Sequence, residues 1–465
     1  MAGTFFGINV AQSGLMAQRL AMDVMSMNIA NANDPTYKRQ RLLLRENTPL
    51  AQAQDATGLG VQVIGGGVST GQIQRVRDAL IENRLRLATG SSAQWEYTRN
   101  VLTQVESVLA EPTDSGLLAD LDQFWAAWNK VATSPDSLPI RNTLIEDAAA
   151  LCARIQYTYT QIANVQDDLN LATRSRVDQI NQIAGEIATI NQEITYGAAG
   201  QAAANRLLDR RDAMVIELSK IVSITQHGEG SDDFILSIGG HVIVQGIDHS
   251  SVTSAEDADG REILYWENGG DEVVVQGGEL KAMYDLNGTL VPDYLSRLDD
   301  LATSLVTEVN NIHTDGMDFD GNPGVEFFTA GSTAANISLN SALVGHPELV
   351  AASATGARGN GYIALQIAEL QQPNLAGGMS IDEIYRALVG TVGGAASSAD
   401  RQAEAQSLSL QQFTTQQQSV SGVSLDEEMA NMIKFQQAYN AAARMLTVMD
   451  EMLGVLIERT GVVGR

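Results

Sequence analysis

The residues with the clearest chemical pattern form one short serine motif. Gly67, Ser69 and Gly71 match the Gly-x-Ser-x-Gly pattern in which serine hydrolases present their nucleophile. That chemistry requires a strand before the serine, a helix after it, and acidic and histidine partners that the sequence does not place. Such a short pattern often arises by chance, so we interpret the segment as a turn and keep a serine hydrolase only as an alternative.

The acidic loop near residue 320 does not predict a metal site. Asp318, Asp320 and Asn322 are spaced like ligands of a calcium loop, but Pro323 and Thr329 stand where that loop needs glycine and glutamate. The five histidines also lack the spacing that places two metal ligands on one helix face. We therefore expect no catalytic residue, no cofactor and no metal, and predict that the protein is not an enzyme.

The charge of the chain limits its partners. Its 465 residues include 56 acidic and 29 basic side chains, a formal net charge of −27, which opposes binding to nucleic acid and to anionic membranes. No stretch approaches 18 consecutive apolar residues, so we expect no membrane insertion. Because the N-terminus has no basic segment followed by a continuous apolar one, we expect no cleavable secretory signal. If the protein leaves the cell, it must use another route.

Both ends of the chain carry an apolar heptad, the pattern of a coiled-coil seam. Ordering the backbone of such a helix costs more free energy than burying its stripe of apolar side chains returns. We therefore expect the termini of an isolated monomer to be largely disordered and to fold when copies assemble. Ser424 and Glu427 predict a capping box at the start of the last helix. The predicted assembly interface consists of Ile8, Leu15, Met22, Met25, Ile29, Met432, Phe435, Tyr439, Leu446, Met449, Leu453 and Leu456.

Helical periodicity dominates the middle of the chain. It runs from about Asp78 to Val222 and is interrupted at 111–112, 134–139 and 197–200 by proline and glycine. The pattern then alternates with a period of two, around a Gly-Gly pair that predicts a β-hairpin. Residues 231–280 hold eleven acidic side chains and one basic side chain. We predict a small acidic β domain inserted into a helical body.

The fold class that follows is mainly α. The N- and C-terminal helices are predicted to pair as a coiled coil, beside a rod domain of long helices and one small inserted antiparallel β domain. We place the terminal domain at 1–40 together with 422–465, and the rod domain at 41–225 together with 290–421. The β domain is placed at 226–289.

Several motifs resemble a known family. Asn28–Asn31 followed by Tyr37–Gln40 is similar to a signature shared by flagellar rod, hook and junction proteins, although Thr36 stands where glycine is usual. More specifically, residues 205–222, 317–328 and 421–439 resemble the flagellar hook-associated protein 1 family, which forms the first hook–filament junction layer. Arg210 stands where that family usually has glutamine.

The resemblance implies a structural subunit of the bacterial flagellum at the hook–filament junction. It implies secretion, unfolded, by the flagellar type III pathway, and an extracellular position. The implied partners are further copies in an axial layer, the hook protein, a second junction protein next to the filament, and an export chaperone on the C-terminal helix. Another axial subunit of the hook or rod stays an alternative, as does a secreted adhesin-like module using residues 226–289.

Overall fold

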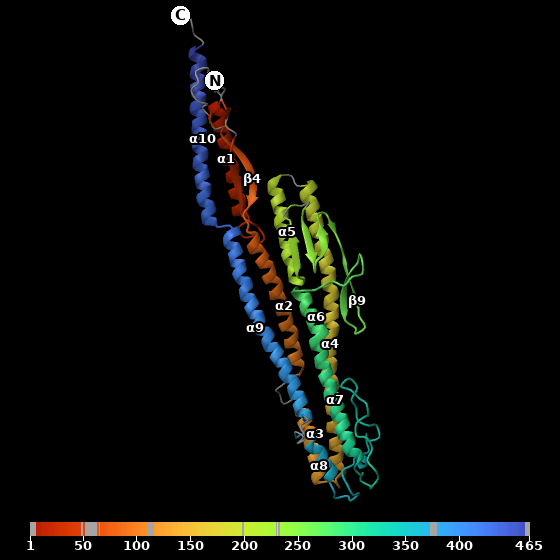
Figure 1. Ribbon diagram of the computed structural model, residues 1–465. Coiled ribbons are helices and arrows are strands. Elements are labelled where there is room, and N and C mark those ends of the chain that lie inside the picture. The colour runs from red at the N-terminus through yellow and green to blue at the C-terminus, as the bar shows by residue number, and fades with distance from the viewer. Residues whose placement is uncertain are drawn as a thin grey trace.

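The computed structural model describes residues 6–47, 50–51, 63–64, 66–109, 116–197, 200–228, 230, 233–372 and 379–460. The molecule is an elongated rod of nearly parallel helices, with both chain ends at one tip (Figure 1). None of the described helices combines the length and the apolar character needed to cross a bilayer. Its α-helices are α1 (Phe6–Ala30), α2 (Ala79–Leu109), α3 (Leu117–Thr133), α4 (Leu138–Gln192), α5 (Gln201–Ile221), α6 (Gly278–Asp285), α7 (Val291–Thr314), α8 (Tyr362–Glu369), α9 (Ile381–Ser421) and α10 (Leu425–Thr460).

The long helices confirm the mainly α fold class and end where proline and glycine predicted. The 55-residue α4 begins with a proline in its first turn and extends about 80 Å at 1.5 Å per residue. It ends in a π-helical segment, Glu193–Gly197, and α5 starts after Gly200, which adopts a φ of 95°. A left-handed φ of this kind is available to glycine at little cost, so the break is encoded locally.

The strands form small antiparallel sheets. One hairpin pairs β1 with β4 and lies beside α1 (Figure 1), and β2 pairs with β3. A four-stranded sheet has the order β5–β6–β7–β8, and β9 pairs with β10. The strand bounds are β1 Gln40–Glu46, β2 Leu50–Ala51, β3 Val63–Ile64, β4 Val68–Arg75, β5 Ile224–His227, β6 Ile235–Ile238, β7 His241–Gln245, β8 Asp248–His249, β9 Val252–Glu256 and β10 Glu262–Trp266.

The predicted Gly-Gly hairpin is confirmed between β6 and β7. Gly239 and Gly240 both have positive φ, as a two-residue turn between twisted strands requires. β10 pairs mainly with β9, and the turn that joins these two strands was not predicted from the sequence. The strands between residues 241 and 266 lie against the helical body, because β7, β8, β9 and β10 all contact α4.

The largest side chains of the body gather at the end opposite the termini. Phe124 and Trp128 of α3 pack against Phe327 and Phe328, which follow α7, with ring centroids 5.1–6.2 Å apart. All four side chains are fully buried. They form the aromatic end of a buried core that is continuous through the body and is closed by contacts within one chain.

Candidate assembly surface at the terminal helix pair

Helices α1 and α10 lie side by side and run antiparallel at the tip of the rod (Figure 1). A move of seven residues along α1 corresponds to a move of seven residues in the opposite direction along α10. A side chain at Gly7 would lie 2.9 Å from Met449, and one at Gly14 would lie 4.0 Å from Ala442. Two heptads beyond Gly14, Asn28 hydrogen-bonds Glu428 of α10. The small residues of α1 let the two backbones approach closely.

The face of α1 that is buried lies one residue before the predicted stripe. Ala17, Ala21 and Val24 are almost completely buried, whereas most of the predicted residues flank this face. Met25 is buried, and the side chain of Leu456 lies outside the described residues. The remaining predicted residues are half-buried: Ile8, Leu15, Met22, Ile29, Met432, Phe435, Tyr439, Leu446, Met449 and Leu453. Their role in assembly stays a prediction.

Sequence reasoning missed a second apolar stripe on α10. Its side chains are 46–60% exposed: Met429, Ile433, Met445, Val448, Met452 and Val455. The last four follow the spacing of three, four and three that marks a coiled-coil seam. The pattern could have been found by stepping from Met445 instead of Met432. An apolar row of this length on a solvent-facing helix is typical of a protein–protein contact.

Asn28 holds the base of the helix pair. Its amide nitrogen donates to the carbonyl of Gln40 at 2.8 Å and to the carboxylate of Glu428 at 2.9 Å. Its amide oxygen accepts from the hydroxyl of Tyr37 at 2.8 Å and from the backbone nitrogen of Gln40 at 3.0 Å. Asn28 is fully buried, so every one of these bonds replaces one to water. Asn28 binds both Tyr37 and Gln40, which accounts for the sequence pattern in which these residues follow the asparagine.

Arg39 connects the same base to the body. Its guanidinium pairs with Glu428 at 2.7 Å and with Glu427 at 2.8 Å, while its backbone nitrogen donates to the carbonyl of Ser421 at the end of α9. Glu427 therefore binds an arginine here, and the predicted capping box is not among the hydrogen bonds of the described residues. A capping box does form at the start of α9, between Ser380 and Glu383.

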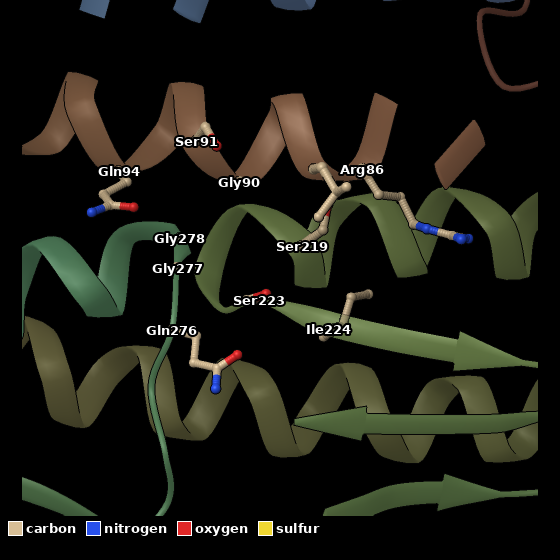
Figure 2. Close-up of a pocket in the computed structure, with 11 residues that line it drawn as sticks. Arg86, Gly90, Ser91, Gln94, Ser219, Ser223, Ile224, Gln276, Gly277 and Gly278 are labelled. Carbon is tan, nitrogen blue, oxygen red and sulfur yellow. The ribbon is translucent and has the colours of Figure 1, made fainter. Parts of the chain in front are cut away.

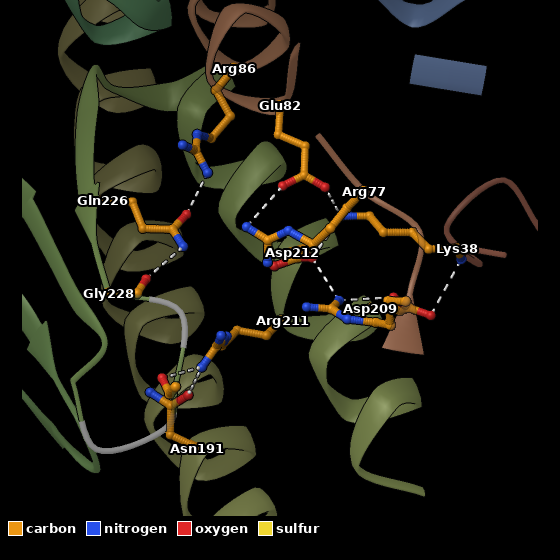
Figure 3. A network of polar contacts seen from close by, with 12 residues as sticks. Lys38, Arg77, Glu82, Arg86, Asn191, Asp209, Arg211, Asp212, Gln226 and Gly228 are labelled. Atoms are coloured by element: carbon orange, nitrogen blue, oxygen red, sulfur yellow. Dashed lines mark hydrogen bonds and ion pairs between the residues drawn. The ribbon is translucent and has the colours of Figure 1, made fainter. Parts of the chain in front are cut away.

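A buried ionic network lies under this base (Figure 3). Lys38 pairs with Glu82 of α2 and, at 2.7 Å, with Asp212 of α5. Arg75 pairs with Asp209 at 2.9 Å and with Asp212 at 2.8 Å. The network joins the segments on both sides of the β1–β4 hairpin to two helices of the body. Because buried charges cost free energy without partners, the geometry of this joint is strongly constrained.

Two of the carboxylates of the network, Asp209 and Asp212, have opposite pKa shifts. Burial raises the pKa of Asp209 to about 6, against the opposing effect of Arg75. Burial also acts on Asp212, but Lys38 and Arg75 outweigh it and hold its pKa at about 2. Asp212 is therefore the fixed negative charge at the centre of the joint.

The residues with possible catalytic or metal chemistry occupy structural positions. Ser69 lies within β4 opposite Arg45 of β1, and its hydroxyl donates to the Arg45 carbonyl at 3.3 Å, so it is not on a strand-to-helix turn. The Asp318 carboxylate accepts from the backbone nitrogens of Asp320 and Asn322 and thus closes its own loop. Within the described residues, no three His, Cys, Asp or Glu side chains could hold a metal ion.

A small pocket of about 150 Å³ lies between α2, the end of α5 and the start of α6 (Figure 2). Gly90 and Gly278 line it because these backbones pack too closely for a side chain. Arg86, Ser91, Ser219 and Ser223 are among the polar residues that line it. The guanidinium of Arg86 donates a hydrogen bond to the side-chain oxygen of Gln226.

Three family models match separate parts of the chain. The flagellar hook-associated protein FlgK helical domain matches residues 102–328. The C-terminal model of the flagellar basal body rod FlgEFG proteins matches residues 416–459, and the flagella basal body rod protein model matches residues 8–38. The two rod models cover the two helices that pair at the tip.

Relatives extend the similarity over the whole chain. Flagellar hook-associated protein 1 of Bacillus subtilis is 27% identical over 511 residues, covering 100% of both chains. The protein of the same name from Salmonella typhimurium is 26% identical and covers 97% of this chain and 99% of its own length. A structure of the flagellar hook junction protein FlgK from Burkholderia pseudomallei superposes with a TM-score of 0.64 at 15% identity, covering 73% of this chain and 100% of its own, which supports the fold.

Proposed function

Because the chain belongs to the flagellar hook-associated protein 1 family, the structural subunits of the hook–filament junction, we infer that it acts there as a non-enzymatic joint assembled through its terminal helices. The observation that carries this proposal is the exposed apolar stripe of α10. Six large side chains are exposed to solvent on a helix that already packs against α1 along another face. Neighbouring copies would remove this stripe from water.

The division of the chain supports the same proposal. The pair α1–α10 is tied to the body mainly through the base formed by Asn28 and Arg39 and the ionic network beneath it. The body has its own aromatic core. We propose that residues 1–40 and 422–465 form the assembly domain, residues 41–225 and 290–421 the rod domain, and residues 226–289 an acidic outer domain.

The proposed partners follow from position in the flagellum. One end of the layer would contact the hook protein and the other the second junction protein. A subunit exported unfolded through the type III pathway would expose the apolar face of α10 beforehand, and an export chaperone would cover it. The alternative of a rod or hook subunit is less well supported, because the helical-domain model matches residues 102–328, outside the shared ends. An adhesin-like module using residues 226–289 stays an alternative.

The substitution Leu446→Asp tests this proposal. It places a charge in the half-buried seam between α10 and α1, and burying an unpaired carboxylate costs several kcal/mol. We expect at least about tenfold fewer hook–filament junctions, since each 1.4 kcal/mol changes an equilibrium tenfold. The readout is immuno-electron microscopy of a tagged copy in cells that lack the native protein.

Leu408→Asp is the matched control. Leu408 lies on α9, another long helix, and is 61% exposed. This variant should form normal junctions, and circular dichroism of both purified variants should show an intact helical body. Normal junctions with Leu446→Asp would refute assembly through the terminal pair.

A further inference from the structure

A groove of about 300 Å³ opens at the base of the terminal pair, between α1, β1 and α10. Ala21 and Met25 of α1 form one wall, Leu42 and Leu44 of β1 form a second, and Phe435 of α10 closes the end. Leu44 is 42% exposed although four apolar side chains surround it. The groove is large enough for aliphatic side chains and is at the small end for a ligand site.

The outer stripe of the same chain cannot fill this groove. Met445 lies ten residues beyond Phe435 on the continuous helix α10, and Met452 lies seventeen residues beyond it. At 1.5 Å per residue these separations are about 15 and 25 Å, and a helix does not fold back on itself. The outer stripe can therefore enter this groove only from another copy of the chain.

Charge supports a second copy as the occupant of the groove. Arg41 lines the groove, and Arg45 lies four residues further along β1. Both are exposed, and neither forms an ion pair within the described part of the chain. Glu451 is exposed beside Met452 on the outer stripe and is likewise unpaired there. The chain thus presents an apolar row with a carboxylate at its side, and a groove whose apolar side chains are joined by the unpaired Arg41.

We propose that the groove of one copy receives Met445, Val448 and Met452 of a neighbouring copy. Arg41 and Arg45 then face Glu451 of that neighbour. The two surfaces differ, so the contact is heterologous and repeats around a ring or along a helix. Val448 lies thirteen residues beyond Phe435, so neighbouring copies would be offset along the axis by about 20 Å. The inference rests on the proposed function and specifies its contact.

Charge reversal tests the ionic part of the contact. In cells lacking the native protein, the variant Arg41→Glu/Arg45→Glu should form about fivefold fewer junctions than wild type, and so should Glu451→Arg, because each places like charges together. Combining all three substitutions in one chain should restore junctions to within about twofold of wild type. A combined variant no better than the single reversals would overturn the proposal. A matched reversal on α9, Arg401→Glu/Glu404→Arg, should have no effect.

Cysteine crosslinking tests the apolar part independently. Two tagged copies are produced together, one with Leu44→Cys and the other with Met452→Cys, and mild oxidation of isolated flagella should join the two tags. The native Cys152 is buried and should not react. Replacing Met452→Cys by Leu408→Cys should give no product. Normal junctions without the crosslink would refute this groove while leaving assembly through the terminal pair intact, which Leu446→Asp tests separately.

Discussion

The end of the body around α3 and α7 buries large side chains completely, whereas the terminal pair buries small ones and leaves large ones exposed. Phe124, Trp128 and Phe327 have no accessible surface, while Met452 and Ile433 on α10 are 56% and 60% exposed. Apolar burial is the main favourable term in folding, so the first region can be stable within one chain. The second reaches comparable burial only with neighbours. Under the proposed function, stability and assembly would therefore depend on opposite ends of the rod.

The largest effect should come from the aromatic end. Phe327→Ala removes a fully buried ring that contacts Phe124, Trp128 and His313. We expect it to lower the free energy of unfolding by about 3–5 kcal/mol, through lost burial and the cavity left behind. Urea denaturation followed by tryptophan fluorescence measures this directly.

The same truncation on α10 sharpens the comparison. Leu446→Ala removes a half-buried side chain, so the urea midpoint of the body should hardly move. Equal destabilisation by Phe327→Ala and Leu446→Ala would show that the two ends share one cooperative core, contrary to the division drawn above.

A smaller effect should come from pH. Acidification should lower the free energy of unfolding of the aromatic end by about 3 kcal/mol. His313 is fully buried, with Nδ1 bonded to the Val325 carbonyl and Nε2 accepting from the backbone nitrogen of Ala351 at 2.8 Å. Burial lowers its pKa from 6.5 to about 4. The unfolded chain therefore binds the proton first, and the stabilisation present above pH 6.5 is lost as the pH falls towards 4.

Hydrogen exchange at a series of pH values can locate this loss. Protection of the segment from His313 to Ala351 should weaken between pH 6.5 and 4. At the joint the sign is opposite, because the pKa of Asp209 is raised to about 6 and protonation there favours the folded form. His313→Gln should remove the pH dependence of the aromatic end, and substituting the exposed His227 should not. A uniform loss of protection along the rod would contradict this assignment.

The sequence predicted most of the fold because its signals are local. Proline and glycine mark the breaks around residues 134 and 200, and the Gly239–Gly240 turn marks its hairpin. The predicted break at 111–112 lies outside the described residues. The buried face of α1 lies one residue before the predicted stripe, because the prediction followed the larger apolar side chains, whereas the smaller Ala17 and Ala21 are the more deeply buried. Close approach at Gly7, where a side chain would lie 2.9 Å from Met449, depends on the partner helix and could not be read from the sequence.

The polar joint could not be predicted for a different reason. Lys38 and Asp212 are 174 positions apart, and Asn28 and Glu428 are 400 apart. Each of these side chains alone looks like an ordinary solvated residue, and only the fold brings opposite charges together. The resemblance pointed to the right segments, 28–40 and 205–222, without showing that they bind one another.

The most local effect should come from Asn28→Ala. The substitution removes the side chain that makes four hydrogen bonds at the base of the terminal pair and leaves Glu428 buried with Arg39 as its remaining partner. Unsatisfied buried polar groups cost about 1–3 kcal/mol, so we expect the opening free energy of the pair to fall by about 2 kcal/mol. Hydrogen exchange of the amides in 17–28 and 431–446 measures it.

Gln18→Ala provides the control on the same helix, because the Gln18 amide oxygen is buried without a hydrogen-bond partner and its removal should cost nothing. Protection of the aromatic end should be unchanged in both variants. If Asn28→Ala exchanged like Gln18→Ala, the heptad contacts alone would hold α1 on α10. The helices α1 and α10 would then separate along their whole contact at once, and Asn28 would serve only to direct the chain from α1 into β1.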